Sequence, residues 1–140
     1  MDDGPATLNR SIKMLHAASD DGIRRIIATP HVSPGLIEFN GPEYIEKLDM
    51  LNDYSDMNQL DVAIYPGAEI MYTDRAAQLL TEGQIPTLAG SEYVLVEFIP
   101  DEEYELIYEA MRSLANAGYI PVVAHVERYK CLVKKPALID

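Results

Sequence analysis

The stretch that decides the fold is Tyr93-Val-Leu-Val-Glu97, a short apolar run that ends in a carboxylate. Three other runs have the same form and also end in a histidine or a glutamate: Arg25-Ile-Ile-Ala-Thr-Pro-His31, Val62-Ala-Ile-Tyr-Pro-Gly-Ala-Glu69 and Tyr119-Ile-Pro-Val-Val-Ala-His125. Short β-branched runs between helical stretches predict buried parallel strands. We therefore expect four strands of one sheet, with their polar ends gathered at one edge.

The segments between these runs have helical periodicity and end at glycines. Helices are expected from about Thr7 to Asp21, from Pro42 past Leu51, from a Thr73 cap to Glu82, and from Asp101 to Ala117. Gly22, Gly83 and Gly118 follow three of them as stop signals. The alternation of strand and helix predicts an α/β fold with a parallel sheet, in a single domain over residues 1–140.

Composition limits the classes of function. The chain has 140 residues, is 48% hydrophobic, and carries 23 acidic against 11 basic residues for a formal charge of -12. This balance argues against a nucleic-acid or anionic-membrane surface, but not against a phosphorylated substrate near bound cations. Cys131 is the only cysteine, so an intrachain disulfide is excluded. With no apolar run of about 18 residues, we expect a cytoplasmic protein without membrane insertion.

The four run-end residues form a candidate metal site. Ligands and chemistry gather at the carboxyl ends of parallel strands, where His31, Glu69, Glu97 and His125 would lie together. Imidazole and carboxylate ligands together suit Zn, Mn or Fe. The alternatives are an ordinary polar histidine at position 31 and salt-bridged carboxylates at the strand ends.

Two further positions lie near this candidate site in sequence. Arg128 follows His125 by three residues, and its guanidinium suits a phosphoryl oxygen, although a pair with Glu127 explains it equally well. Asp2 and Asp3 are either loop carboxylates that face the same site or an acidic pair at a helix start.

A set of motifs, in order along the chain, resembles the PHP (polymerase and histidinol phosphatase) superfamily. The closest similarity is to the bacterial PHP-type protein tyrosine phosphatases of capsule and exopolysaccharide operons. The motifs are Asp-Asp-Gly-Pro at 2–5, Ala-Thr-Pro-His at 28–31, Tyr-Pro-Gly-Ala-Glu-Ile at 65–70, Ile-Pro-Thr-Leu at 85–88, Val-Glu-Phe at 96–98 and Ala-His-Val-Glu-Arg-Tyr at 124–129.

The resemblance implies a distorted (β/α) barrel of PHP/TIM-like type, with divalent ions, usually manganese, at the strand ends. It implies metal ligation by His31, Glu69, Glu97 and His125, with Asp3 as a further ligand, and phosphate binding by Arg128. The implied reaction is hydrolysis of phosphotyrosine on a tyrosine kinase that controls polysaccharide synthesis. Histidinol phosphatase, or a nuclease-like activity that the acidic charge disfavours, is the alternative within the superfamily.

The chain also departs from the family pattern. A His-x-His strand before the first motif and an Asp-x-His strand after the last are typical of the family, and neither is present among residues 1–140. We therefore expect a partial barrel without its first and last strands, with impaired activity, or a non-catalytic fragment that binds metal or a partner. Its open sheet edges would favour homo-oligomers.

Overall fold

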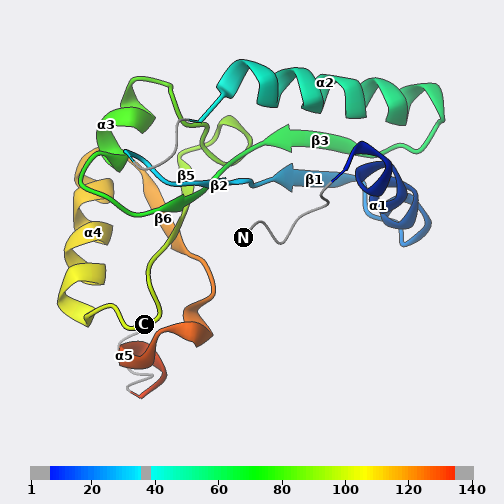
Figure 1. The fold of residues 1–140 in the computed structure, drawn as a ribbon. Coiled ribbons are helices and arrows are strands. Elements are labelled where there is room, and N and C mark those ends of the chain that lie inside the picture. Colours follow the sequence, from blue (N-terminus) through cyan, green and yellow to red (C-terminus); the bar gives the residue numbers. More distant parts are fainter. Residues whose placement is uncertain (1–6, 36–38, 135–140) are drawn as a thin grey trace.

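The computed structural model describes residues 7–35 and 39–134, and Figure 1 shows its arrangement. Four helices alternate with short strands: α1 (Leu8–Asp20), α2 (Gly41–Met57), α3 (Ala76–Thr81) and α4 (Tyr104–Asn116). The strands are β1 (Arg25–Ala28), β2 (His31–Val32), β3 (Ala63–Pro66), β4 (Glu69–Met71), β5 (Tyr93–Glu97) and β6 (Ile120–Val123). Two short 3-10 turns, η1 (Leu88–Gly90) and η2 (Val126–Arg128), and helix α5 (Lys130–Val133) complete the described residues.

All strand pairs are parallel, as expected, but they form two sheets. β1 pairs with β3, and the second sheet has the order β2-β4-β5-β6. The expectation of one continuous sheet is wrong because each of the first two runs is divided into two strands that belong to different sheets. Thr29 and Pro30 separate β1 from β2, and Gly67 and Ala68 separate β3, which ends at Pro66, from β4. Pro30 and Pro66, at these two breaks, have no N–H to donate to a ladder, and beyond them each run continues as a new strand of the second sheet.

Local signals explain most helix ends. The Thr7 hydroxyl accepts a hydrogen bond from the Arg10 amide at the start of α1, and Asn40 does the same for the Glu43 amide in α2. Gly118 has φ of +92° after α4, a conformation that favours glycine, and the next amide, of Tyr119, donates to the Leu114 carbonyl.

Two helix starts differ from the expectation. α3 begins at Ala76, because the Thr73 carbonyl accepts the Ala76 amide in a turn and the Thr73 hydroxyl caps nothing. α4 begins at Tyr104, because Asp101 lies in a turn closed by the bond from the Glu102 amide to the Ile99 carbonyl.

Two apolar clusters hold the layers together. The larger one packs α3 and α4 against one face of the four-stranded sheet, as Figure 1 shows, with Ile70, Val94, Val96 and Leu114 at its centre. The smaller one joins α1 and α2 to β1 and β3 through Leu15, Leu48, Leu60, Val62 and Ile64. None of the helices in the described residues is long and apolar enough to cross a membrane.

Candidate metal centre

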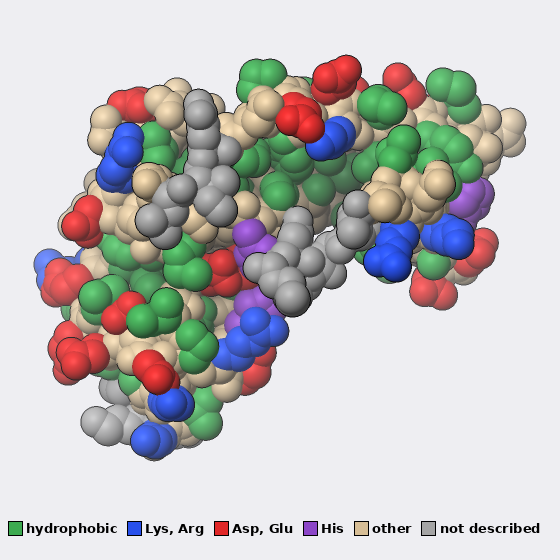
Figure 2. Space-filling model, in the orientation of Figure 1, with side chains coloured by type: hydrophobic (Ala, Val, Ile, Leu, Met, Phe, Trp, Pro, Cys, Tyr) green, Lys and Arg blue, Asp and Glu red, His purple; other side chains and the backbone are tan. Residues whose placement is uncertain are grey.

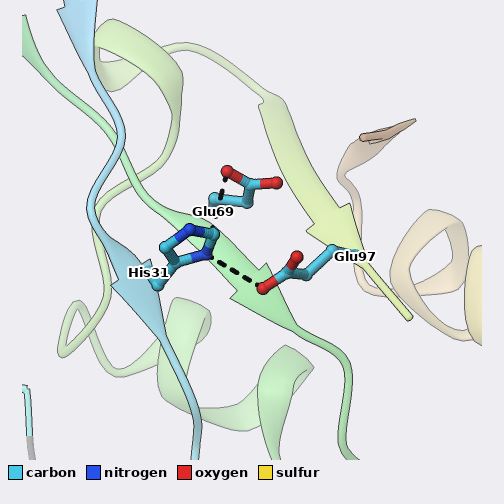
Figure 3. Close-up of side chains that lie close together, drawn as sticks. All are labelled: His31, Glu69 and Glu97. Atoms are coloured by element: carbon cyan, nitrogen blue, oxygen red, sulfur yellow. Dashed lines mark hydrogen bonds and ion pairs between the residues drawn. The ribbon is translucent and has the colours of Figure 1, made fainter. Parts of the chain in front are cut away.

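The fold brings the four run-end residues to neighbouring strands. His31 opens β2 and Glu69 opens β4, Glu97 ends β5, and His125 follows the last residue of β6 by two positions. His31 is paired with Glu69 in the parallel register, and Glu97 is paired with Met71. The side chains of His31, Glu69 and Glu97 therefore converge from three adjacent strands, as Figure 3 shows.

The distances among these side chains suit one small cation. Ligand atoms of His31, Glu69 and Glu97 all lie within 4.8 Å of one another. His31 Nδ1 is 3.0 Å from Glu97 Oε1 and 3.9 Å from Glu69 Oε2. His125 joins the group from the other side, with its Nε2 3.1 Å from Glu69 Oε1. Figure 2 shows purple histidine and red carboxylate side chains side by side near the middle of this face.

Glu69 is the central residue of the group. Its side chain is 10% exposed, and it has a histidine on each side. Although Oε1 lies within hydrogen-bonding distance of His125, the geometry gives no hydrogen bond, and this oxygen is buried without a partner in the part of the chain that the structure describes. A buried carboxylate oxygen in this state needs a cation or a donor. The donor set of one imidazole and two carboxylates, with a second imidazole beside it, fits a divalent metal such as Mn, Fe or Zn.

His125 has an unusual backbone conformation. Its φ of +51° and ψ of +42° lie in the left-handed region, where non-glycine residues are uncommon. The chain leaves β6 at this point and enters η2, whose first bond runs from the Arg128 amide to the His125 carbonyl at 2.8 Å. Such conformations gather at functional sites when the surrounding structure enforces them. Here the conformation turns the chain at the position where His125 approaches Glu69.

Arg128 and Glu127 both lie in η2. Arg128 Nε is 3.9 Å from Glu127 Oε1, which is too long for a hydrogen bond, and the Arg128 side chain is 55% exposed. Glu127 also lies 3.8 Å from His125 Nδ1. The pair with Glu127 is therefore loose and the guanidinium is accessible, and phosphate binding by Arg128 stays a prediction. Asp3, the further ligand expected from the resemblance, lies outside the described residues.

Sequence reasoning missed two tyrosines whose hydroxyls bond backbone groups near the ends of the strands that lead to the site. The Tyr44 hydroxyl joins the ends of β1 and β3, since it donates to the Ala28 carbonyl and accepts from the Gly67 amide. The Tyr129 hydroxyl joins the ends of β5 and β6 in a similar way. The one signal in the sequence is that a buried tyrosine generally finds a polar partner, which does not reveal which backbone groups it bonds.

The charges of the site also reach Tyr129. Burial raises the pKa of the Tyr129 phenol, and the negative charges of Glu97 and Glu69 raise it further. The bond from the Phe98 amide and the positive charge of Arg128 act in the opposite direction. The two carboxylates therefore create a negative potential at the strand ends, which favours a cation there.

Comparison with known proteins agrees with this geometry. The family model for capsular polysaccharide synthesis proteins CpsB/CapC matches residues 1–140. The chain belongs to this family. It is 33% identical over 132 residues to the tyrosine-protein phosphatase CpsB of Streptococcus pneumoniae, an alignment that covers 94% of the chain and 54% of CpsB. It is 34% identical over 139 residues to the tyrosine-protein phosphatase YwqE of Bacillus subtilis (strain 168), covering 99% of the chain and 55% of YwqE.

The chain has the same fold as a solved structure from a study of YwqE from Bacillus subtilis and CpsB from Streptococcus pneumoniae. That study describes the two proteins as unique metal-dependent tyrosine phosphatases. The TM-score is 0.85 at 36% identity, over 99% of this chain and 56% of the solved one. The expected PHP-type α/β fold of parallel strands with flanking helices is thereby confirmed. The chain spans about half the length of the curated relatives that it matches.

Proposed function

We propose that the chain forms part of the active site of a metal-dependent protein tyrosine phosphatase, in which His31, Glu69, Glu97 and His125 hold divalent cations. The observation that carries this proposal is the buried Glu69 Oε1, which has no hydrogen-bond partner in the described residues although two histidines flank its carboxylate. Bound cations would supply charge that polarises a phosphoryl oxygen and lowers the pKa of water.

Arg128 is the proposed phosphate-binding residue. Its half-exposed guanidinium follows His125 by three residues, and its loose contact with Glu127 leaves its donors available to a phosphoryl oxygen. Such a group would position the substrate and stabilise charge that develops on it. Asp3 is proposed as a further metal ligand, on the motif at 2–5 alone.

The relatives indicate the substrate class. The similar proteins are named tyrosine-protein phosphatases, so we propose phosphotyrosine on a protein as the substrate, and a tyrosine kinase of capsule or exopolysaccharide synthesis as the partner. Manganese is the proposed ion, ahead of iron or zinc. A single PHP domain over residues 1–140 and a cytoplasmic location stay predictions. The other candidate is a module that binds metal without catalysis, because the chain spans about half of its relatives.

Metal binding and hydrolysis are tested on the same protein. We expect calorimetry to detect Mn²⁺ binding, and a phosphotyrosine peptide to be hydrolysed, at the impaired rate expected of a partial barrel, only when Mn²⁺ is present. Glu97→Gln and His125→Ala should abolish both signals, and Glu109→Gln, on an exposed side chain of α4, should leave both unchanged. Alkylation of Cys131 should have no effect, because no covalent cysteine intermediate is proposed.

The outcomes separate the two candidates. Mn²⁺ binding without hydrolysis would favour the non-catalytic module, whereas binding with hydrolysis supports the phosphatase. If the chain binds no Mn²⁺, or if binding survives both Glu97→Gln and His125→Ala, the proposed site is wrong.

A further inference from the structure

Among the residues that the structure describes, Tyr129 is the largest side chain that is fully buried, at 1% exposure. Its ring packs edge-on against Phe98, with ring centroids 6.0 Å apart, inside the larger apolar cluster. Its hydroxyl nevertheless has two partners. It accepts a hydrogen bond from the Phe98 amide at 3.1 Å and donates one to the Ala124 carbonyl at 2.8 Å.

These two backbone groups flank the candidate ligands. Phe98 comes directly after Glu97, and Ala124 comes directly before His125. The bond from the Ala124 amide to the Val96 carbonyl, at 2.8 Å, lies just beyond the last paired residues of β5 and β6. The Tyr129 hydroxyl then connects the two strands one step further along. The hydroxyl thus takes the place of the next direct hydrogen bond between the two strands, which would join the Phe98 amide to the Ala124 carbonyl.

The bridge lies next to a backbone position with an uncommon conformation. His125 lies in the left-handed region directly after Ala124, and η2 carries the chain back so that Tyr129 reaches underneath the strand ends. Without the hydroxyl, the Phe98 amide and the Ala124 carbonyl would lose their shared partner in a buried place. Direct pairing of these two groups or entry of a water would satisfy them again, and either response changes the separation of the strand ends that carry Glu97 and His125.

We infer that Tyr129 is a positioning residue for the metal centre, because its hydroxyl fixes the strand ends that present Glu97 and His125. This inference rests on the proposed function. Tyr129 does not touch the cation or the substrate. It acts through one peptide unit on each strand, and so controls the separation of two ligands that come from different strands.

The test compares the Mn²⁺ affinity of Tyr129→Phe with that of the unsubstituted chain by calorimetry. Phenylalanine keeps the ring and its packing and removes the hydroxyl alone. We expect Mn²⁺ affinity to fall about tenfold, the lower end of the effect of supporting residues around metal ligands. A purely structural role would lower stability and leave the affinity of the folded protein unchanged.

Ser55→Ala is the matched control. Ser55 is fully buried in α2, and its hydroxyl also bonds two backbone groups, the amide and the carbonyl of Val62. It belongs to the α2–β3 contact and not to the strands that carry the ligands. We expect Ser55→Ala to destabilise the chain and to leave Mn²⁺ affinity unchanged. Equal affinities for the full chain and Tyr129→Phe would overturn the inference and leave the proposed function standing. If the full chain itself binds no Mn²⁺, both are wrong.

A second measurement needs no variant. Coupling between two sites is reciprocal, so Mn²⁺ should strengthen the bridge if the bridge strengthens Mn²⁺ binding. In hydrogen exchange of the unsubstituted chain, the Phe98 amide should become more protected when Mn²⁺ is added, by a larger factor than the Val62 amide, which donates to Ser55. The same gain at both amides would indicate general stabilisation and would contradict the inference.

Discussion

Glu69 is a buried carboxylate with an oxygen that has no hydrogen-bond partner in the described residues, and these two properties seldom occur together. Carboxylates are almost never buried without a partner, yet Glu69 is 8% exposed and one of its oxygens makes no hydrogen bond in the described residues. Its neighbours explain why it is tolerated, since imidazoles approach both of its oxygens, at 3.1 and 3.9 Å. A second carboxylate, Glu97, shares the same space. This arrangement is unfavourable for two bare charges and favourable for a cation between them.

Glu69→Gln therefore has opposite effects on metal binding and on the stability of the metal-free chain. Removal of one of two neighbouring negative charges should leave the thermal midpoint without metal unchanged or raised. Substitution of residues that hydrogen-bond metal ligands lowers metal affinity roughly 10- to 100-fold. Because Glu69 is itself a candidate ligand, Glu69→Gln should lower Mn²⁺ affinity by more than this. Thermal unfolding with and without Mn²⁺ measures both, with Glu109→Gln as the exposed control. A metal-free midpoint that falls markedly would show that Glu69 has a mainly structural role.

Tyr44 gives a pH dependence at the same scale. Burial raises the pKa of its phenol above the ordinary value of 10.0, against the bond from Gly67, so the folded state favours the neutral form. Its contribution to stability is complete below about pH 10, where the unfolded phenol ionises, and is lost as the pH rises through the higher folded pKa. Tyr44→Phe should cost about 1–3 kcal/mol at neutral pH, because it leaves buried backbone groups unpaired.

Above pH 10, the Tyr44→Phe chain should lose stability less steeply than the unsubstituted chain. Urea unfolding at a series of pH values measures the two slopes. Tyr93→Phe, on a half-exposed side chain, is the control, and we expect it to follow the unsubstituted chain. Parallel curves for Tyr44→Phe and the unsubstituted chain would contradict the assignment.

At the scale of elements, side chains of α2 hydrogen-bond the backbone of β3 and of the residue before it, as a neighbouring strand would. Within residues 7–35 and 39–134, β3 has one strand partner, β1, so the backbone groups of its other edge are not paired with a strand. The Asn52 side chain donates to the Ile64 carbonyl at 3.0 Å and accepts from the Ile64 amide at 2.8 Å. Ser55 bonds both backbone groups of Val62. Side chains of one helix thus occupy an edge that would otherwise pair with another chain.

Asn52→Ala should lower the free energy of unfolding by about 1–3 kcal/mol, because both backbone groups of Ile64 lose a partner in a partly buried place. The Ile64 amide should also exchange faster with solvent. Asn58→Ala removes an exposed side chain that bonds the Tyr54 carbonyl in the same helix, and should cost much less. If both substitutions lowered the free energy of unfolding equally, the contacts of Asn52 with β3 would contribute no more than the exposed hydrogen bond of Asn58 at the end of α2.

At the scale of the whole molecule, charge and exposed apolar surface act against each other. The formal charge is -12, which favours separation of chains and weakens the compact state. Yet the strands expose apolar side chains, among them Ile27 of β1 in the two-stranded sheet, and Tyr93 of β5 with Ile120 and Val122 of β6 in the four-stranded sheet. Parallel sheets are normally covered on both faces. The expected self-association stays a prediction that depends on this balance.

Salt should therefore stabilise the metal-free chain. An increase of NaCl from about 0.1 to 1 M shortens the screening length from about 10 to 3 Å and weakens the repulsion. We expect a gain on the order of 1 kcal/mol, or roughly 3 °C in the thermal midpoint of a chain of this length. NaCl is preferable to sulfate, which strengthens apolar burial on its own account. A falling midpoint would show that local ion pairs outweigh the net repulsion. Sedimentation in the same buffers measures self-association.

Local patterns predict the elements of this protein well. Apolar runs specify the strands, and caps such as Thr7 and stops such as Gly118 specify helix ends, because each depends on neighbours within a few residues. The same patterns miss the start of α3, because Thr73 lies in a turn that tertiary packing determines. They also miss the division into two sheets, because Pro30 and Pro66 stand at the breaks whereas Pro121 lies within β6, so a proline alone does not show where a run changes sheet.

The sequence by itself determined the types of the candidate ligands and their place at the ends of parallel runs, since strand polarity brings such ends together whatever the details of packing. Only the tertiary structure decided that Glu69 is central and has an unpartnered oxygen, and that Tyr129 bridges the backbone next to Glu97 and His125. These properties depend on distances of about 3 Å between residues far apart in the chain. Periodicity and composition carry no information at that resolution, because many packings satisfy the same local pattern.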